Sequence, residues 1–184
     1  MPTAPASRDP LDELLAKQSL HELMSAYCRA VDRADEDALR SLFHPEAIVN
    51  GGVVNGTAAA FANGVASWLR ANAPVAFHTI TNEYFEISGD HAVGECYVLA
   101  INTTRGDTGN TDTITAGRYL DRFERRGGEW KFIEHTFVMD CNLNQPSSAV
   151  FNDAIHPPGR MRGTYSPDDP SAAFWRRSRA EGTP

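Results

Sequence analysis

The chain has few cysteines and no long apolar run, and both features bear on where it works. Its three cysteines, Cys28, Cys96 and Cys141, are an odd number and form no CxxC pair. This pattern predicts no disulfide framework and fits a reducing compartment. No stretch approaches the ~20 apolar residues that span a bilayer, and residues 1–10 lack the apolar core of a signal peptide. We therefore expect a soluble, cytoplasmic protein without a membrane partner.

Positive charge is also scarce. Lysine and arginine number 17 against 24 aspartates and glutamates, which gives a formal net charge of −7. An acidic chain repels the phosphate backbone, so nucleic acid is not an expected partner. The basic pairs Arg125-Arg126 and Arg176-Arg177 are too short to alter this expectation.

Common cofactor and catalytic motifs are missing as well. The sequence has no glycine-rich loop between a strand and a helix, no HExxH or other metal-ligand spacing, and no G-x-S-x-G nucleophile elbow. We therefore predict neither a cofactor nor a metal site. With 184 residues, 41% of them hydrophobic, the chain is long enough for one domain with a substantial core.

The hydrophobic pattern changes its period along the chain. From Leu11 to Ala34 apolar residues recur every three or four positions, as in an amphipathic helix. A short helix is expected after Asp35, a hairpin within 47–54, and a further helix over 58–72. Beyond Pro74 the period is two, which predicts antiparallel strands over 77–87, 92–103, 111–125 and 129–142. Helices followed by such strands indicate an α+β fold, with helices on one face of a curved sheet.

This pattern divides the chain into three parts. Residues 1–10 are expected to form a flexible N-terminal arm, and residues 11–145 a single domain. Residues 146–184 are rich in proline, so we predict an extended tail that packs on the domain or on a neighbouring subunit, anchored by Phe174 and Trp175.

Four stretches together resemble the SnoaL-like branch of the nuclear transport factor 2 superfamily: "YCRAVDRAD" (27–35), "FHTITN" (77–82), "GRYLDRFERRGGEWKF" (117–132) and "PPGRMRGTYSPDDPS" (157–171). The resemblance covers roughly residues 11–171. It implies a cone-shaped α+β barrel in which N-terminal helices pack on a mostly antiparallel sheet around one pocket. Bile-acid dehydratases, scytalone dehydratase and hexachlorocyclohexane dehydrochlorinase are the relatives it suggests.

The same resemblance implies a catalytic site. In these enzymes an aspartate at the end of the first helix orients a histidine at the start of a strand, and Asp32 and His78 hold these positions. Tyr27 matches a tyrosine typical of the bile-acid dehydratases. His135 stands where the family often has an arginine on the last strand.

Each candidate also has a purely structural interpretation. His78 should share a strand face with Ile80, Asn82 and Tyr84, a mixture typical of a pocket wall, but it could equally be a core histidine. Asp32 is disfavoured near a helix C-terminus, so it needs a partner: His78 in a catalytic pair, or Arg33 at the surface.

The remaining candidates are Tyr27, as a third catalytic residue, and three substrate-binding residues. Tyr27 lies on the apolar stripe of its helix and either packs in the core or directs its hydroxyl into a pocket. On the last strand His135 shares a face with large apolar residues. The face of the 92–103 strand that lines the pocket stays open, and we include Tyr97 together with His135 and Asn82 as substrate-binding candidates.

The leading hypothesis is a cofactor-independent lyase that acts on a small hydrophobic cyclic substrate. His78 would be the general base, oriented by Asp32, while Tyr27 or His135 would hold or protonate the departing group. The alternatives are an isomerase or polyketide cyclase, and a non-catalytic ligand-binding or oxygenase-partner subunit. Because helices on one side leave the other face of a sheet bare, and because relatives are commonly oligomeric, we also expect a homo-oligomer, either a dimer or a trimer.

Overall fold

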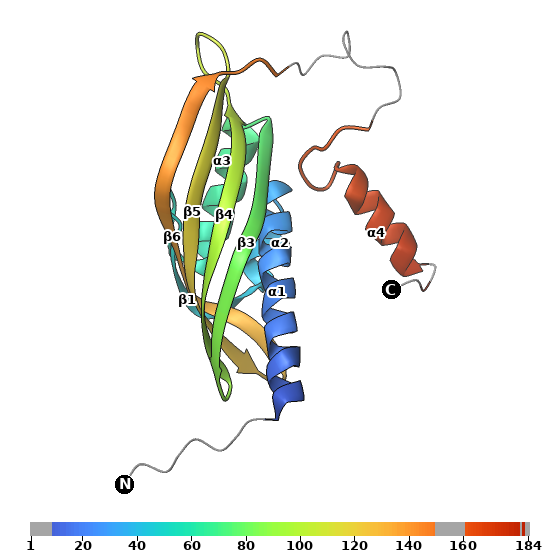
Figure 1. The fold of residues 1–184 in the computed structure, drawn as a ribbon. Helices are drawn as coiled ribbons and strands as arrows, with labels where there is room; N and C mark the ends of the chain where they lie inside the picture. Colours follow the sequence, from blue (N-terminus) through green and yellow to red (C-terminus); the bar gives the residue numbers. More distant parts are fainter. Residues whose placement is uncertain (1–8, 150–160, 181, 183–184) are drawn as a thin grey trace.

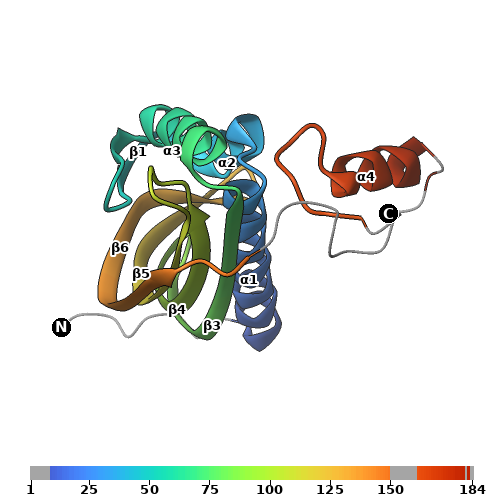
Figure 2. The ribbon, with the colours of Figure 1, turned by 90° about the horizontal axis from the view of Figure 1, so that it is seen from above.

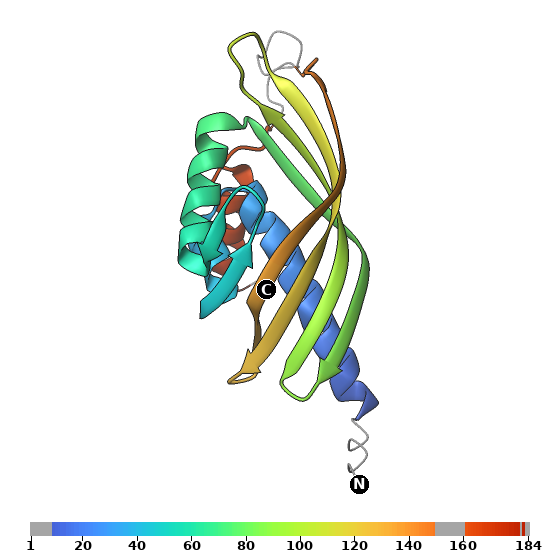
Figure 3. The same cartoon turned by 90° about the vertical axis from the view of Figure 1, so that its left-hand side faces the viewer.

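The computed structural model describes residues 9–149, 161–180 and 182. A layer of helices packs on one side of a single sheet (Figures 1 and 3). The helices are α1 (Pro10–Asp32), α2 (Glu36–Ser41), α3 (Ala58–Asn72) and α4 (Pro170–Ala180). The strands are β1 (Phe43–Asn50), β2 (Asn55–Thr57), β3 (Val75–Ser88), β4 (His91–Thr104), β5 (Thr111–Arg126) and β6 (Glu129–Pro146).

Local signals set the ends of α1. Asp9 is the N-cap and accepts a hydrogen bond from the Leu11 backbone N–H at 2.9 Å, while Pro10 occupies the first turn, where its missing N–H is harmless. The helix stops at Asp32, and Ala34 then turns the chain with φ of +46°. The buried side of α1 is apolar, and it includes Leu20, Met24 and Val31. These contacts fix α1 against the core and so fix the position of Asp32 at its end.

The other two domain helices also begin at capping residues. Asp35 accepts a hydrogen bond from Ala38 N at the start of α2, and Thr57 accepts one from Ala60 N at the start of α3. Helix α3 buries Phe61 and Leu69, among other residues. The helices predicted from the sequence are therefore confirmed, with small differences at their ends.

The strands form one curved sheet in the order β2-β1-β6-β5-β4-β3. Every pairing is antiparallel except that of β1 with β6. Helices α1 and α3 lie across the open side of the curve (Figure 2). The α+β fold with helices on one face of a curved sheet is thus confirmed. The sheet does not close into a full barrel, because its two edge strands, β2 and β3, do not pair with each other.

The two faces of the sheet differ in burial. Cys96, Val98 and Ala100 of β4 point toward the helices and are nearly inaccessible, whereas Tyr97 and Leu99 are 45% and 40% exposed on the outer face. The face of β4 that lines the interior is therefore the one with Cys96, Val98 and Ala100, and Tyr97 lies outside it.

The C-terminal segment is helical where the sequence suggested an extended tail. Strand β6 continues to Pro146, and α4 follows residues 161–169 at the side of the domain (Figure 1). Helix α4 buries no residue, and Phe174 is half exposed, so it does not anchor the tail in the core. Trp175 instead contacts Arg29 of α1, whose guanidinium carbon lies 5.9 Å from the ring centroid. No helix in the described ranges is long and apolar enough to cross a bilayer.

Candidate active site

A cavity of about 220 Å³ lies between the sheet and helices α1 and α3. Its wall is largely apolar and includes Val31, Phe61, Trp68, Val98 and Phe137. A few polar side chains interrupt this surface: Tyr27, His78, Asn102, Thr115 and Tyr119. A mainly apolar cavity with few polar groups is typical of a site for a small hydrophobic molecule.

Asp32 and His78 meet at this cavity. Asp32 Oδ1 lies 2.7 Å from His78 Nδ1, and Asp32 Oδ2 accepts a hydrogen bond of 3.1 Å from the His78 backbone N–H. The predicted contact between the two side chains is confirmed. The double contact fixes the ring and occupies Nδ1, which leaves Nε2 as the nitrogen that can act in the cavity. Such an arrangement can remove a proton from a bound molecule.

His78 is the partner that compensates the carboxylate of Asp32 at the helix C-terminus. The Asp32 carboxylate contacts the imidazole and the backbone N–H of His78. The Arg33 guanidinium instead donates to the main-chain oxygen of Asp32 at 3.4 Å and pairs with Asp169. Asp32 therefore pairs with His78 and does not form a surface ion pair with its neighbour.

A second aspartate–histidine pair lies behind Tyr27. His135 Nδ1 is 2.6 Å from Asp121 Oδ1, and His135 Nε2 is 2.9 Å from the Tyr27 hydroxyl. His135 is fully buried and Asp121 is 3% exposed, whereas Tyr27 reaches the cavity wall. The cavity is thus flanked by His78 on one element and by a Tyr27–His135–Asp121 chain on others.

Two tyrosines, Tyr27 and Tyr119, line the cavity. Burial raises the pKa of Tyr27 well above its ordinary value, while a hydrogen bond from Tyr119 opposes that rise. Burial likewise raises the pKa of Tyr119. Both side chains are therefore neutral. Cys28 is not a candidate nucleophile, because burial raises its pKa to about 12.

Three predicted substrate-binding residues do not line the cavity. His135 is separated from it by Tyr27, and Tyr97 lies on the outer face of β4. Asn82 is exposed, with φ of +47°, in a bulge where the pairing of β3 with β4 shifts between Thr81 and Tyr84. The extra residue reverses the side that each later side chain faces, so Asn82 does not follow His78 inward.

Sequence reasoning missed several residues that the structure brings together. Asp121 was not considered, although it shares one face of β5 with Tyr119 and Phe123. In the structure it pairs in register with His135 on β6. A period of two could therefore have placed this acid in the core. Asn102 and Thr115 carried no signal of their own, because polar residues near strand ends are common on surfaces. Within the described residues no group of three His, Cys, Asp or Glu side chains could hold a metal ion.

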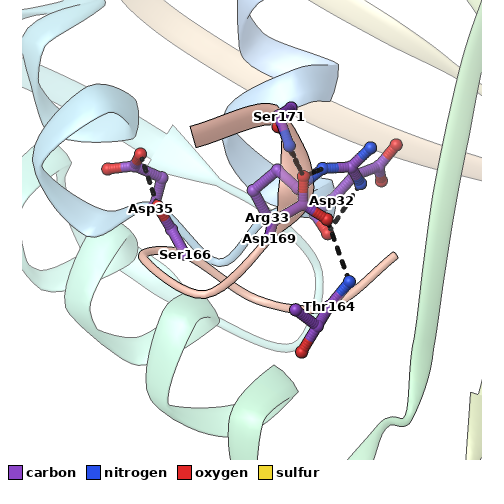
Figure 4. A network of polar contacts seen from close by, with 7 residues as sticks. All are labelled: Asp32, Arg33, Asp35, Thr164, Ser166, Asp169 and Ser171. Atoms are coloured by element: carbon purple, nitrogen blue, oxygen red, sulfur yellow. Dashed lines mark hydrogen bonds and ion pairs between the residues drawn. The ribbon is translucent and has the colours of Figure 1, made fainter. Parts of the chain in front are cut away.

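Residues 164–171 are held against the end of α1 by hydrogen bonds and an ion pair (Figure 4). The Ser166 backbone N–H donates to the Arg33 carbonyl at 2.8 Å, and Ser166 Oγ bonds Asp35 at 3.2 Å. Asp169, 4% exposed, accepts hydrogen bonds from the backbone N–H groups of Thr164 and Ser171 and pairs with Arg33 at 3.3 Å. These contacts hold the residues on the C-terminal side of Asp32.

We predict that Asp169→Ala lowers stability by about 1–3 kcal/mol, because partly buried hydrogen bonds lose their acceptor. Burial opposes the charge of Asp169, but hydrogen bonds from Ser171 and Thr164 and the charge of Arg33 hold its pKa below the usual value. The measurement is urea unfolding of the variant beside Asp168→Ala, since Asp168 is the exposed neighbouring acid. Equal stability of the two variants would show that the contacts of Asp169 contribute nothing.

The fold and the cavity together define an α+β protein with a helix-covered curved sheet and a His–Asp pair in its interior. A family model described as a SnoaL-like domain matches residues 12–136. The chain belongs to this SnoaL-like family.

Solved structures share this architecture. A hexachlorocyclohexane dehydrochlorinase (LinA) of type 2 is 25% identical, with a TM-score of 0.69, over 83% of this chain and 100% of that one. A type 3 enzyme of the same name from Novosphingobium barchaimii LL02 is 24% identical, with a TM-score of 0.66, over 77% and 97%. A putative scytalone dehydratase from Novosphingobium aromaticivorans DSM 12444 is 20% identical, with a TM-score of 0.65, over 82% and 97%. A comparison with curated proteins gives no significant match.

Proposed function

We propose that this protein is a cofactor-independent lyase that eliminates a leaving group from a small hydrophobic cyclic substrate. The observation that carries the proposal is the Asp32–His78 pair, whose ring reaches a largely apolar cavity of about 220 Å³. The similarity to a hexachlorocyclohexane dehydrochlorinase at 25% identity supports elimination as the type of reaction. The cavity size favours a compact ring system over an extended chain.

His78 is the general base in this mechanism. Its Nε2 takes a proton from a substrate carbon, and the electrons of that C–H bond form the new double bond as the leaving group departs. Asp32 holds the ring through Nδ1 and stabilises the imidazolium that forms. Tyr27 reaches the same cavity as a neutral hydroxyl and can hold the departing group. A positioned base contributes about 10²–10⁴-fold to the rate.

Product mass tests the type of reaction. We expect a panel of hydroxylated and halogenated cyclic compounds to give products lighter by water or hydrogen halide. Products of unchanged mass would indicate the second candidate, an isomerase or cyclase that uses the same base to move a proton. That candidate is supported by the hydroxyls of Tyr27 and Tyr119 at the cavity, which could hold a substrate carbonyl. A protein that binds these compounds without converting any would be a ligand-binding subunit.

The outer face of the sheet supports self-association. Apolar side chains that are 37–68% exposed gather there, namely Phe77, Tyr97, Leu99, Ile101 and Leu143. Exposed apolar surface of this kind favours an interface between copies. We predict a dimer or trimer in light scattering, compared with 20.2 kDa for one chain, and a shift toward monomer for Leu99→Glu. A wild-type monomer at working concentration would contradict this prediction.

A further inference from the structure

The buried pair of Asp121 and His135 has an unusual charge environment. Asp121 Oδ1 contacts His135, but Asp121 Oδ2 has no hydrogen-bond partner among the described residues. The rings of Phe43, Phe61 and Phe132 surround His135 with centroids 5.5–6.2 Å away. The titratable groups near the pair are tyrosines, thiols and acids: Tyr27, Tyr119, Cys28, Cys96 and Glu134. None of these groups supplies a positive charge.

Electroneutrality then decides how many protons the pair holds. A lone carboxylate beside a neutral imidazole would place a net negative charge in an apolar interior, which costs several kcal/mol. The pair avoids this cost when it keeps one more proton, either as imidazolium with carboxylate or as neutral imidazole with carboxylic acid. Because Nδ1 faces Asp121, both forms place a proton on His135 Nε2. Nε2 is therefore a donor toward Tyr27.

The Tyr27 hydroxyl must then direct its own proton elsewhere. Its oxygen lies 2.9 Å from His135 Nε2 and accepts the hydrogen bond that this nitrogen donates. With that bond received, Tyr27 cannot donate its own proton to His135, and its side chain lies at the cavity wall, where a substrate oxygen can accept the proton. If His135 Nε2 were unprotonated, Tyr27 would instead donate backward and offer the cavity only lone pairs.

We propose that His135 and Asp121 form a proton relay that makes Tyr27 the general acid of the site, and that the leaving group is a hydroxyl. This inference rests on the proposed lyase function and specifies its substrate class. As the bond from carbon to the hydroxyl oxygen breaks, that oxygen keeps the electron pair and takes the Tyr27 proton, which forms water. The Tyr27 oxygen simultaneously takes the Nε2 proton of His135, so no buried tyrosinate forms.

The two pairs then carry complementary changes in charge. His78 gains the proton removed from carbon and becomes positive, while the Tyr27–His135–Asp121 chain has lost one proton and becomes more negative. The cavity and Tyr27 lie between these opposite charges, which stabilise each other. After product release His78 gives up the proton that it took from carbon, and one proton returns through Tyr27 to His135 Nε2, which restores the starting state. A halide leaves without a proton, so a relay of this kind serves an oxygen leaving group.

The first test reads the proton directly and needs no substrate. The full-length protein is labelled with ¹⁵N-histidine, and ring nitrogens are assigned by two-bond proton–nitrogen correlation near neutral pH. We expect His135 Nε2 to be protonated, with the signal assigned by its loss in His135→Phe or in Asp121→Leu/His135→Phe, which avoids an unpaired acid. A His135 ring protonated only on Nδ1 would overturn the relay, whatever the outcome for His78.

The second test uses matched cyclic substrates that carry a hydroxyl or a chloride on the same ring. We expect Asp121→Leu/His135→Phe to lower kcat on the hydroxyl compound about 10²-fold or more with little change in KM, as for loss of a general acid. Loss on the chloride compound should be only a few-fold. His44→Gln is the matched control. His44 is also buried, but its Nε2 lies 3.0 Å from the Glu124 carbonyl oxygen and the residue does not line the cavity.

The outcomes separate the two proposals. Conversion of only the hydroxyl compound by the wild type supports the relay, whereas conversion of only the chloride compound overturns it. An equal loss on both compounds in the double variant also overturns it and leaves His78 as the base. Conversion of both compounds by His78→Ala would contradict the lyase mechanism itself, even if the relay proton is found.

Discussion

His78→Ala is expected to abolish measurable turnover while the protein stays folded. The imidazole is the base at the cavity, and its loss removes about 10²–10⁴-fold from the rate. The side chain is only partly buried, so its removal leaves few unsatisfied groups beyond Asp32, which still accepts the backbone N–H of residue 78. The measurement is kcat and KM on a substrate found in the panel, with thermal unfolding recorded for each variant.

Asp32→Asn separates the charge of the carboxylate from its shape. The amide can still accept from the residue 78 backbone, but it no longer stabilises an imidazolium, so we expect a severe loss in kcat. In His78→Ala/Asp32→Asn the loss should barely exceed that of the worse single variant, because the pair acts as one unit. Losses that add, or that track the melting temperature, would indicate a structural pair.

His21→Ala provides the matched control for these variants. His21 also pairs with an acid, since its Nδ1 lies 2.6 Å from Glu83, but the histidine is exposed on α1. We expect near-normal turnover for this variant. Near-native rates in well-folded His78→Ala protein on an authentic substrate would end the case for His78 as the base.

The elements that bring Asp32 and His78 together were predictable from the sequence, because a change of period from 3.6 to two is a strong local signal. The first helix was expected over 11–34 and observed over 10–32, and the third over 58–72 as observed. The pairing of the two side chains came from the resemblance to a family. No local pattern relates positions 46 residues apart, so the contact itself needed either that resemblance or the structure.

Failures of the sequence analysis have specific physical causes. The bulge after Thr81 cannot be read from alternation, because one inserted residue reverses every later side chain, and Asn82 was misplaced for this reason. Helix α4 was missed because prolines dominate the segment before it, although Pro170 at its first position is compatible with a helix start. His135 was placed on the correct strand, but only packing shows that Tyr27 stands between it and the cavity.

His135→Leu is expected to lower the free energy of unfolding by about 3–5 kcal/mol. The substitution leaves Asp121 buried without its only hydrogen-bond partner among the described residues, and breaking one side of a buried charged pair has a cost of this size. Burial already raises the pKa of Asp121, against the effect of the nearby imidazole. The measurement is guanidinium unfolding of the variant and the wild type under identical conditions.

Asp121→Leu/His135→Leu shows whether this pair exists for stability or for function. Apolar replacement of both members removes the unpaired charge, so much of the lost stability should return, as commonly happens when a buried ion pair is replaced by packed side chains. Turnover should not return with it, because Tyr27 still lacks a donor behind its oxygen. Recovery of both stability and turnover would mean that the pair only fills the core. Recovery of stability alone would show that a stable apolar interior is available at this position, and that the buried acid and imidazole contribute to the chemistry at Tyr27.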